Sequence, residues 1–294
     1  MVRHLSYIML LILCLSGFTK LSAQTRHALF IGISNYPAYS EWNSLHADND
    51  SSILYKIFTA HHMQWHALRN EHATKAEITN TLNRLLAIVQ SGDTLLIHFS
   101  CHGQQMEDDN GDEADCLDEA LIPYDAEMRY EKGYYEGEHH LRDDELNRHL
   151  LDIRKQIGNR GLVIVSLDAC HSTSGTRKDK EATVRGTDYI FSSSGKGQAL
   201  AQSPQRTRYI DTPLDENSRM APLIVISACK SYQKNTEVRV DGEYYGALSY
   251  YLCQALMHCP FGNIKQWLRM LKQQMQQNLR HQSPMIESTL PDIL

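Results

Sequence analysis

Two Cys-His pairs in the sequence could do chemistry: Cys101-His102 and Cys170-His171. A thiol beside an imidazole is the minimal apparatus for acyl transfer, because the imidazole can take the thiol proton and later protonate a leaving amine. Two Cys and two His are also a tetrahedral zinc set in number and kind. The choice between these two chemistries depends on the elements that position the pairs.

Both pairs follow apolar runs that are typical of buried strands: "DTLLIHFS" (93–100) precedes the first and "LVIVSLD" (162–168) precedes the second. Successive side chains of an extended chain point to opposite faces, so Cys101 and His102 cannot face one ion unless the backbone turns between them. The same holds for the second pair, and neither pair shows the ligand gap of ordinary zinc modules. Zinc is therefore the weaker interpretation.

The same alternation selects one member of each pair. Ser100 and His102 share one side of their strand, and Asp168 and Cys170 share one side of theirs. If these two sides face a common cleft, His102 can activate the Cys170 thiol, while the other members of the pairs point elsewhere. Gly103 would let a backbone N–H approach a developing oxyanion without a side chain in the way.

Strand-like and helix-like segments alternate along the chain. Further apolar runs are "HALFIGIS" (27–34) and "APLIVISA" (221–228), and "WHALRNE" (65–71) is a weaker strand candidate. Apolar residues recur at helical spacing in four segments, over residues 78–89, 146–157, 248–256 and 264–275. This alternation predicts a single α/β sandwich with a mostly parallel sheet, in which ligands bind beyond the carboxyl ends of the strands.

The N-terminal segment has the pattern of a secretory signal peptide. Residues 1–23 carry Arg3 near the start, an apolar centre from Tyr7 to Leu15, and small residues at the end. The apolar centre is too short for a bilayer core of about 30 Å, so no stable membrane span is expected. The sequence predicts a cleaved signal peptide over 1–23, a domain over 24–294, and export to the periplasm or out of the cell.

Composition describes an ordinary globular protein with a mildly acidic surface, since the net charge is −6 and 42% of residues are hydrophobic. The sequence has no basic block, which argues against nucleic-acid binding. Seven cysteines less Cys14 of the signal segment leave six, and in an exported chain these could form disulfides. Cys101–Cys116 and Cys253–Cys259 are close enough in sequence to be candidate bridges.

Two connections are longer than a compact domain normally tolerates without a functional reason. The first runs from Gly103 to about Arg142 and includes the acidic run "EDDNGDEADCLDE" (107–119). The second runs from His171 to about Met220. It carries seven scattered basic residues: Arg177, Lys178, Lys180, Arg185, Lys196, Arg206 and Arg208.

The blocks "FSCHGQQ" and "VSLDACHSTSG" resemble the two signature blocks of the caspase-like cysteine peptidases, and of the metacaspases in particular. The likeness extends from "HALFIGISNY" through "SLHADNDSSIL", "DEADCLDEALIPYD" and "LRDDELN" to "VISACKSYQKNTE" and "GALSYYL". It implies a caspase-like three-layer α/β/α sandwich with about six strands, the last drawn from "SPMIEST" (283–289). It also implies a catalytic dyad of His102 and Cys170, an oxyanion hole from the N–H groups of Gly103 and Cys170, and no cofactor required for the chemistry.

The resemblance implies protein or peptide substrates cleaved after Arg or Lys. Asp50, Ser100 and Asp168 would then form the pocket for the basic side chain, which pairs with carboxylates and excludes an acidic side chain. The alternative role of Asp50 is to cap the helix that follows it.

Calcium is a candidate activator. The acidic run 107–119 places carboxylates and an amide at some EF-hand positions, but Glu113 stands where the loop needs glycine, so an EF-hand is not expected. The resemblance implies another calcium site, made from Asp118, Asp143, Asp144 and Asp179. A solvated acidic loop remains the alternative.

An enzyme directed to Arg or Lys could cut itself in its own basic connection, residues 171–220. The sequence departs from the family pattern at Cys101, Cys116 and Thr173, each where the family has Gly, but no catalytic group is missing. The alternative is a non-catalytic caspase-fold protein that binds a metal or a partner in the same cleft.

Overall fold

The computed structural model describes residues 24–108, 111, 116–170, 183–193, 219–230, 233–291 and 293. The predicted signal peptide, residues 1–23, lies outside the described residues. The strands are β1 (Arg26–Gly32), β2 (Gln64–Arg69), β3 (Thr94–Ser100), β4 (Gly103–Glu107), β5 (Leu117–Leu121), β6 (Leu141–Arg142), β7 (Leu162–Asp168), β8 (Leu223–Ser227), β9 (Val238–Val240), β10 (Glu243–Tyr245) and β11 (Met285–Ser288). The α-helices are α2 (Ala47–Ala60), α3 (Lys75–Ile88), α4 (Asp143–Ile157), α6 (Ala247–His258) and α7 (Ile264–Asn278).

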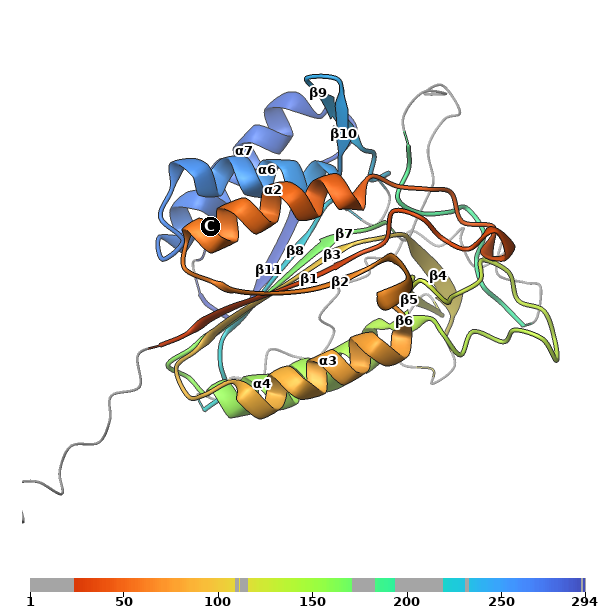
Figure 1. Cartoon of the computed structure of the whole chain (residues 1–294), viewed down its shortest axis with the longest axis horizontal. Coiled ribbons are helices and arrows are strands. Elements are labelled where there is room, and N and C mark those ends of the chain that lie inside the picture. Colours follow the sequence, from red (N-terminus) through yellow and green to blue (C-terminus); the bar gives the residue numbers. More distant parts are fainter. Residues whose placement is uncertain are drawn as a thin grey trace, which may run out of the picture.

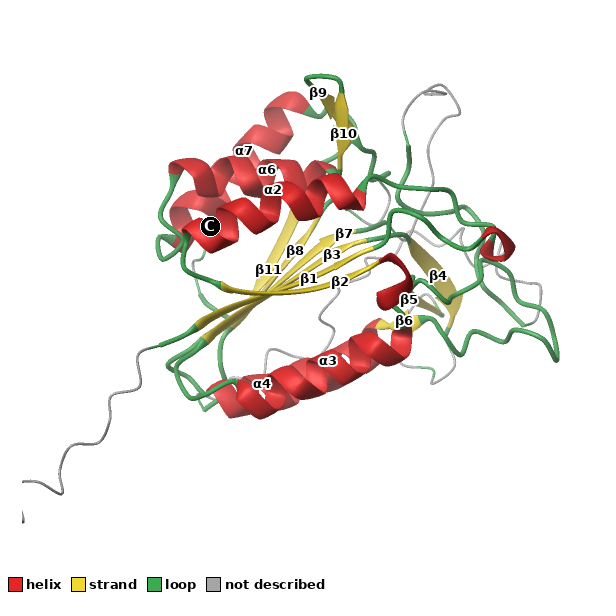
Figure 2. Cartoon of the chain, in the orientation of Figure 1, coloured by secondary structure: helices red, strands yellow, loops and turns green. Residues whose placement is uncertain are grey.

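The central sheet of the described chain has six strands in the order β11-β8-β7-β3-β1-β2 (Figure 2). All neighbouring strands are parallel except β11, which pairs antiparallel with β8. The predicted α/β sandwich is therefore confirmed, including a last strand within residues 283–289.

Helices cover both faces of this sheet: α2, α6 and α7 lie on one face, and α3 and α4 on the other (Figure 1). Strand alternation produces this arrangement. Leu95, Ile97 and Phe99 of β3 pack into the core on the α3 and α4 side, while Leu96 belongs to the core beneath α2, α6 and α7. Cys101 continues the first of these series and is buried in the α3 and α4 core.

The carboxyl ends of the parallel strands share one edge of the sheet. Ser100 at the end of β3 lies opposite Asp168 at the end of β7, so the residues after them start from neighbouring positions. The small antiparallel sheet β4-β5-β6 and the β9-β10 hairpin lie near this edge (Figure 1). The β4-β5-β6 sheet is formed by the connection between residues 103 and 142, in which the sequence analysis predicted no strand.

The six described cysteines are all free, so the two candidate disulfides are wrong in this structure. Cys101 is buried in the core, whereas Cys116 is exposed in the turn before β5. Cys253 lies on α6 with its Sγ directed to the carbonyl oxygen of Ile53, 3.8 Å away, rather than to Cys259. Sequence proximity alone does not bring these thiols to bonding geometry.

Among the described residues, no helix has both the length and the apolar character needed to cross a membrane.

Candidate active site

His102 lies between the end of β3 and the start of β4, and its ring is almost completely buried. The Nε2 atom lies 2.8 Å from the carbonyl oxygen of Asn43, to which it donates, so Nδ1 carries no proton in the neutral ring. Nδ1 is buried and has no hydrogen-bond partner among the described residues. The rings of Tyr36 and Trp42 hold the imidazole, with centroids 5.3 and 4.9 Å away.

Burial lowers the pKa of His102 to about 4. The Asn43 carbonyl opposes this shift and the nearby Arg185 charge adds to it. At neutral pH the ring is therefore an unprotonated base, which is the form that can take a proton from a thiol.

Cys170 follows β7 by two residues and is buried. Its Sγ lies 3.2 Å from the carbonyl oxygen of Gln233 and 3.7 Å from the Sγ of Cys229. The hydrogen bond to Cys170, followed by burial, raises the pKa of Cys229, so this second sulfur stays a thiol. The sequence alone gives no sign of this contact between Cys229 and Cys170.

Two backbone N–H groups at this edge of the sheet converge on one carbonyl oxygen. The N–H of Cys170 lies 2.9 Å from the oxygen of Arg185, and the N–H of Gly103 lies 3.3 Å from the same atom. This pair of donors has the geometry that stabilises an oxyanion formed on a peptide carbonyl. The backbone of Arg185 therefore contacts Cys170 and Gly103, the residue that follows His102.

The segment that carries Arg185, residues 183–185, pairs antiparallel with residues 235–237. The N–H of Arg185 donates to the oxygen of Asn235 at 2.9 Å, and the N–H of Glu237 donates to the oxygen of Thr183 at 2.9 Å. Val184 pairs with Thr236 between these two bonds. Extended pairing of this kind is how many proteins hold a peptide main chain.

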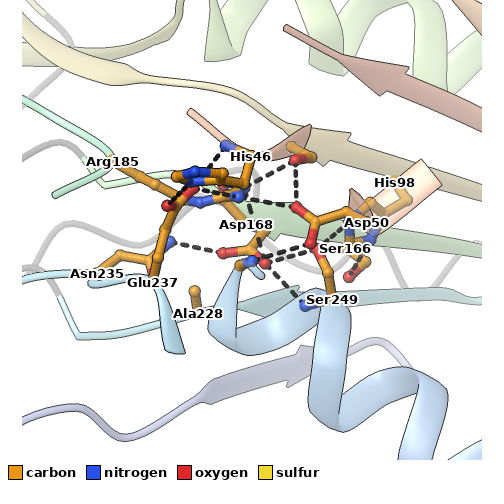
Figure 3. Close-up of polar contacts among 12 residues, drawn as sticks. His46, Asp50, His98, Ser166, Asp168, Arg185, Ala228, Asn235, Glu237 and Ser249 are labelled. Atoms are coloured by element: carbon orange, nitrogen blue, oxygen red, sulfur yellow. Dashed lines mark hydrogen bonds and ion pairs between the residues drawn. The ribbon is translucent and has the colours of Figure 1, made fainter. Parts of the chain in front are cut away.

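The side chain of Arg185 enters a fully buried acidic pocket, in which it approaches Asp50 and Asp168 (Figure 3). Ser100, the third residue predicted to line the pocket, is buried there as well. Its Nη2 lies 2.8 Å from Asp50 Oδ2, and its Nη1 lies 2.7 Å from Ser100 Oγ. Nη1 is also 3.9 Å from Asp168 Oδ2. Asp50 lies inside the first turn of α2, where His46 rather than Asp50 is the cap residue, so the alternative role of Asp50 is not supported.

The N-terminus of α6 holds the two predicted carboxylates. The N–H of Gly246 donates to Asp50 Oδ1 at 2.9 Å, and both the N–H and the hydroxyl of Ser249 donate to Asp168 Oδ2, at 2.7 and 2.6 Å. Asn235 donates to Asp168 Oδ1 at 2.7 Å. The positive end of the helix dipole favours anions at this position.

The two carboxyl groups differ in pKa. Burial raises the pKa of Asp50, and the Arg185 charge only partly offsets it. Burial acts in the same direction on Asp168, but there Arg185, His98 and the hydrogen bonds from Asn235 and Ser249 outweigh it, and its pKa is lowered. Asp168 is therefore the more firmly ionised of the two.

Glu237 is a third carboxylate of the pocket and was missed by the sequence analysis. Its Oε1 lies 2.9 Å from Arg185 Nη2, and its side chain is fully buried. "NTEVRV" has no feature that marks this glutamate as buried. The strand pairing of residues 235–237 with the Arg185 segment, a long-range contact, carries it into the pocket.

The predicted calcium ligands do not form a metal site within the described residues, where no group of three or more His, Cys, Asp or Glu could hold an ion. Asp118 forms an ion pair with Arg142 instead, although Asp143 and Asp144 do begin α4 directly after this arginine. Asp179 lies outside the described residues, as do His171 and all the basic residues of the connection named above except Arg185. The described residues thus do not fit calcium by themselves.

The fold and the site define a class of protein. This α/β sandwich has a buried, neutral His and a Cys after the carboxyl ends of adjacent parallel strands, and the N–H groups of that Cys and of the Gly after the His share one peptide carbonyl. This is the architecture of a caspase-like thiol peptidase. The chain matches the family model of the caspase domain over residues 25–294. The chain belongs to the caspase-domain family.

Relatives place it near the metacaspases. It is 26% identical over 227 residues to Metacaspase-1B of Neosartorya fischeri, covering 69% of this chain and 52% of that protein. It is 25% identical over 244 residues to Metacaspase-1 of Mycosarcoma maydis, covering 74% of this chain and 57% of that protein. The chain spans about half the length of these curated relatives.

A solved structure has the same fold. The crystal structure of protein GSU0716 from Geobacter sulfurreducens matches with a TM-score of 0.63 at 20% identity, covering 91% of this chain and 95% of that chain.

Proposed function

We propose that the chain is a cysteine endopeptidase that cleaves peptide bonds after Arg or Lys, with His102 as the base and Cys170 as the nucleophile. The observation that carries this proposal is the position of Arg185. Its carbonyl oxygen accepts from the N–H groups of Gly103 and Cys170, and its guanidinium lies among buried carboxylates. An arginine bound in this way occupies the position that a substrate residue would occupy if its carbonyl group belonged to the bond that is cleaved.

The chemistry follows from this placement. His102 Nδ1 takes the thiol proton, and the sulfur of Cys170 attacks the carbonyl carbon, while the two N–H groups hold the developing oxyanion. The protonated ring then gives its proton to the leaving amine as the C–N bond breaks, which leaves a thioester on Cys170. Water hydrolyses this thioester, so that the peptide leaves as a carboxylic acid and the thiol is restored. An acidic side chain in the pocket would be repelled by the carboxylates that attract Arg185.

We propose further that the chain processes itself at the Arg185–Gly186 bond. Residues 183–185 already make the strand contacts of a bound peptide. Because Arg185 fills the pocket, an uncut chain excludes other substrates, and cleavage is the step that allows the segment to leave.

The test is the intact mass and N-terminal sequence of fragments from the purified chain. Wild type should give a fragment that begins Gly-Thr-Asp-Tyr, since Gly186 becomes a new N-terminus. Cys170→Ala and His102→Ala should stay intact, whereas Cys116→Ser, a change at an exposed cysteine, should cut like wild type. A fragment that also appears in Cys170→Ala, or one that starts elsewhere in the connection, would contradict self-cleavage at this bond.

Activity on other substrates needs a separate assay. Processed wild type should hydrolyse a peptide that ends in Arg before a reporter group, and it should lose this activity in both dyad variants. If neither self-cleavage nor peptide hydrolysis occurs in wild type, the non-catalytic alternative holds.

Calcium activation and export are also proposals. Calcium rests on the resemblance and on the acidic residues Asp118, Asp143, Asp144 and Asp179. Calcium binding would require the ion pair between Arg142 and Asp118 to break. The rate of self-cleavage, measured in calcium and in chelator, tests whether calcium activates the protein. Export rests on the composition of residues 1–23, which the N-terminal sequence of the protein from its native source would test.

A further inference from the structure

Two sulfur atoms are in contact at the edge of the sheet that carries the candidate dyad. The Sγ atoms of Cys170 and Cys229 are 3.7 Å apart, and both lie close to the carbonyl oxygen of Gln233, at 3.2 and 3.4 Å. Both residues are buried and both are free thiols. The proposed reaction uses Cys170 alone and assigns no role to Cys229.

The backbone brings these two residues together. Cys170 follows β7 by two residues, and Cys229 follows β8 by two residues. The two strands are parallel neighbours with Leu167 opposite Ser227, and the N–H of Ala228 donates to the oxygen of Leu167 at 3.0 Å. Neighbouring strands are about 4.8 Å apart, which is within the roughly 4.4–6.8 Å that a disulfide spans between Cα atoms. A bond between the two sulfurs therefore needs movement of side chains rather than a rearrangement of the sheet.

Burial limits which molecules can reach these sulfurs. The exposed fraction of Cys170 is 2% and that of Cys229 is 7%. The backbone of Gly186 also packs against Cys170, because a Cβ built there would lie 3.3 Å from the Cβ of Cys170. A bulky thiol such as glutathione therefore has little access, whereas hydrogen peroxide is barely larger than water. The Cys229 thiol is already in contact with Cys170, so it is available to an oxidised Cys170 when a larger thiol is not.

The two sulfurs differ in reactivity. The hydrogen bond to Cys170, followed by burial, raises the pKa of Cys229 well above its ordinary value, whereas Cys170 has His102 as its proposed base. Peroxide reacts with the thiolate form of cysteine. Cys170 is therefore the sulfur that is oxidised first, and Cys229 is the thiol that reacts with the oxidised product.

We propose that Cys170 and Cys229 form a reversible disulfide in the presence of a peroxide, and that this bond inactivates the peptidase by blocking its nucleophile. Reduction by a dithiol restores both thiols and with them the activity. The inactivation rests on the proposed function, whereas formation of the bond does not.

The reaction has two steps. In the first, the Cys170 thiolate attacks hydrogen peroxide and the O–O bond breaks, which leaves a sulfenic acid on Cys170 and a hydroxide that takes a proton from solvent. In the second, the Cys229 sulfur attacks the Cys170 sulfur, loses its proton, and displaces the hydroxyl group as water. The two sulfurs are oxidised by two electrons in total, and the two oxygens of the peroxide are reduced to water.

The chemical test treats the purified wild-type chain with excess hydrogen peroxide. Peptide mapping should find Cys170 linked to Cys229, in a pair of peptides that has lost two hydrogen atoms relative to the reduced peptides. Cys253→Ser, a change at a cysteine of α6 with the same exposed fraction as Cys229, should form the same link. A wild-type chain that gains oxygen atoms on Cys170 without the link, links Cys170 to another cysteine, or leaves both thiols reduced would overturn the inference.

The functional test measures hydrolysis of an Arg peptide after the same treatment, as a fraction of the untreated activity of each protein. Wild type should lose its activity and regain it in dithiothreitol. Cys229→Ser has no second thiol, so its Cys170 should proceed to the irreversible sulfinic acid, and the fraction it recovers should be at least about tenfold lower. Equal recovery in the two proteins would overturn the inactivation by this bond. A Cys170–Cys229 link in a wild-type chain that hydrolyses no peptide would refute the proposed function but not the disulfide.

Discussion

His102 is a base whose protonation is controlled by its surroundings. One ring nitrogen donates to the Asn43 carbonyl, and the other is buried without a partner in the part of the chain that the structure describes. A proton added to this ring would be a charge placed in a desolvated site, next to the positive Arg185. This explains why burial, with Arg185, lowers the pKa of His102 to about 4.

The lowered pKa predicts unusual acid tolerance of self-cleavage. An imidazole with an ordinary pKa of about 6.5 is mostly protonated at pH 5, whereas His102 is mostly neutral there and still able to accept the thiol proton. Chain made by cell-free translation should therefore cut itself at pH 5 at a rate within about threefold of that at pH 7. A loss of rate centred near pH 6.5 would argue against this environment for the base.

Strand alternation predicted which side of β3 the residues around His102 would face. Alternation placed His102 and Ser100 on one side of β3, and the structure indeed directs Ser100 to Asp50 while it buries Cys101 in the opposite core. Burial raises the pKa of the Cys101 thiol to about 12, which fits a structural role. Glu237 could not be predicted in this way, because its burial depends on a long-range pairing.

The segment around Arg185 belongs to the site as an element rather than as one side chain. Beyond the strand-like residues 183–185, the chain turns along β4, where Gly103 pairs with Gly186 and Met106 pairs with Phe191. Gly186 lies directly against the backbone of Cys170. A Cβ built at Gly186 would lie 2.3 Å from the carbonyl oxygen of Cys170.

This close approach predicts that Gly186→Ala slows self-cleavage. Because the contact is with backbone, the segment must shift to accommodate a methyl group, and a displaced carbonyl loses its two N–H donors. The rate should fall at least about tenfold, while Gly262→Ala, where a Cβ meets nothing within 4 Å, should cut like wild type. A Gly186→Ala chain that cuts at the wild-type rate would show that the observed conformation is not the one that reacts.

At the scale of helices and strands, the sequence predicted those elements whose own residues carry a clear hydrophobic pattern. The apolar runs placed β1, β3, β7 and β8 within two residues of their observed bounds, because strands covered on both faces are apolar throughout. The short strands of β4-β5-β6 and the β9-β10 hairpin have no such signal. They form at the edge of the larger sheet, where contacts distant in sequence stabilise them.

Over the whole molecule, the acidic pocket connects parts of the fold that the sheet alone does not join. Asp50 comes from α2, Asp168 from β7, and Glu237 from the segment before β9, while α6 supplies donors from its first turn. Arg185 is the cation placed among all three carboxylates, and these carboxylates raise its pKa although burial opposes them. An uncut chain therefore has a fully buried charge cluster at the centre of the site.

Removal of that cation should destabilise the uncut protein. In the Cys170→Ala background, Arg185→Ala leaves three buried carboxylates without their partner, which costs about 3–5 kcal/mol in the free energy of unfolding at pH 7. Urea titration measures this difference, with Arg239→Ala, a change at an exposed residue of β9, as the control.

The pH dependence of this loss of stability distinguishes the effect of the Arg185 charge from the effect of its packing. In the parent, the pKa of Asp168 lies below its ordinary value, so the stabilisation is present above the ordinary Asp range and is lost as the pH falls through the lowered pKa. Burial raises the pKa of Asp50, and Arg185 opposes this shift. Without Arg185, Asp50 should therefore take up a proton on folding, which stabilises the variant as the pH falls. The difference in the free energy of unfolding between the Cys170→Ala parent and its Arg185→Ala variant should therefore decrease from pH 7 to about pH 4. A difference that stays constant over this range would mean that Arg185 stabilises the chain by packing alone.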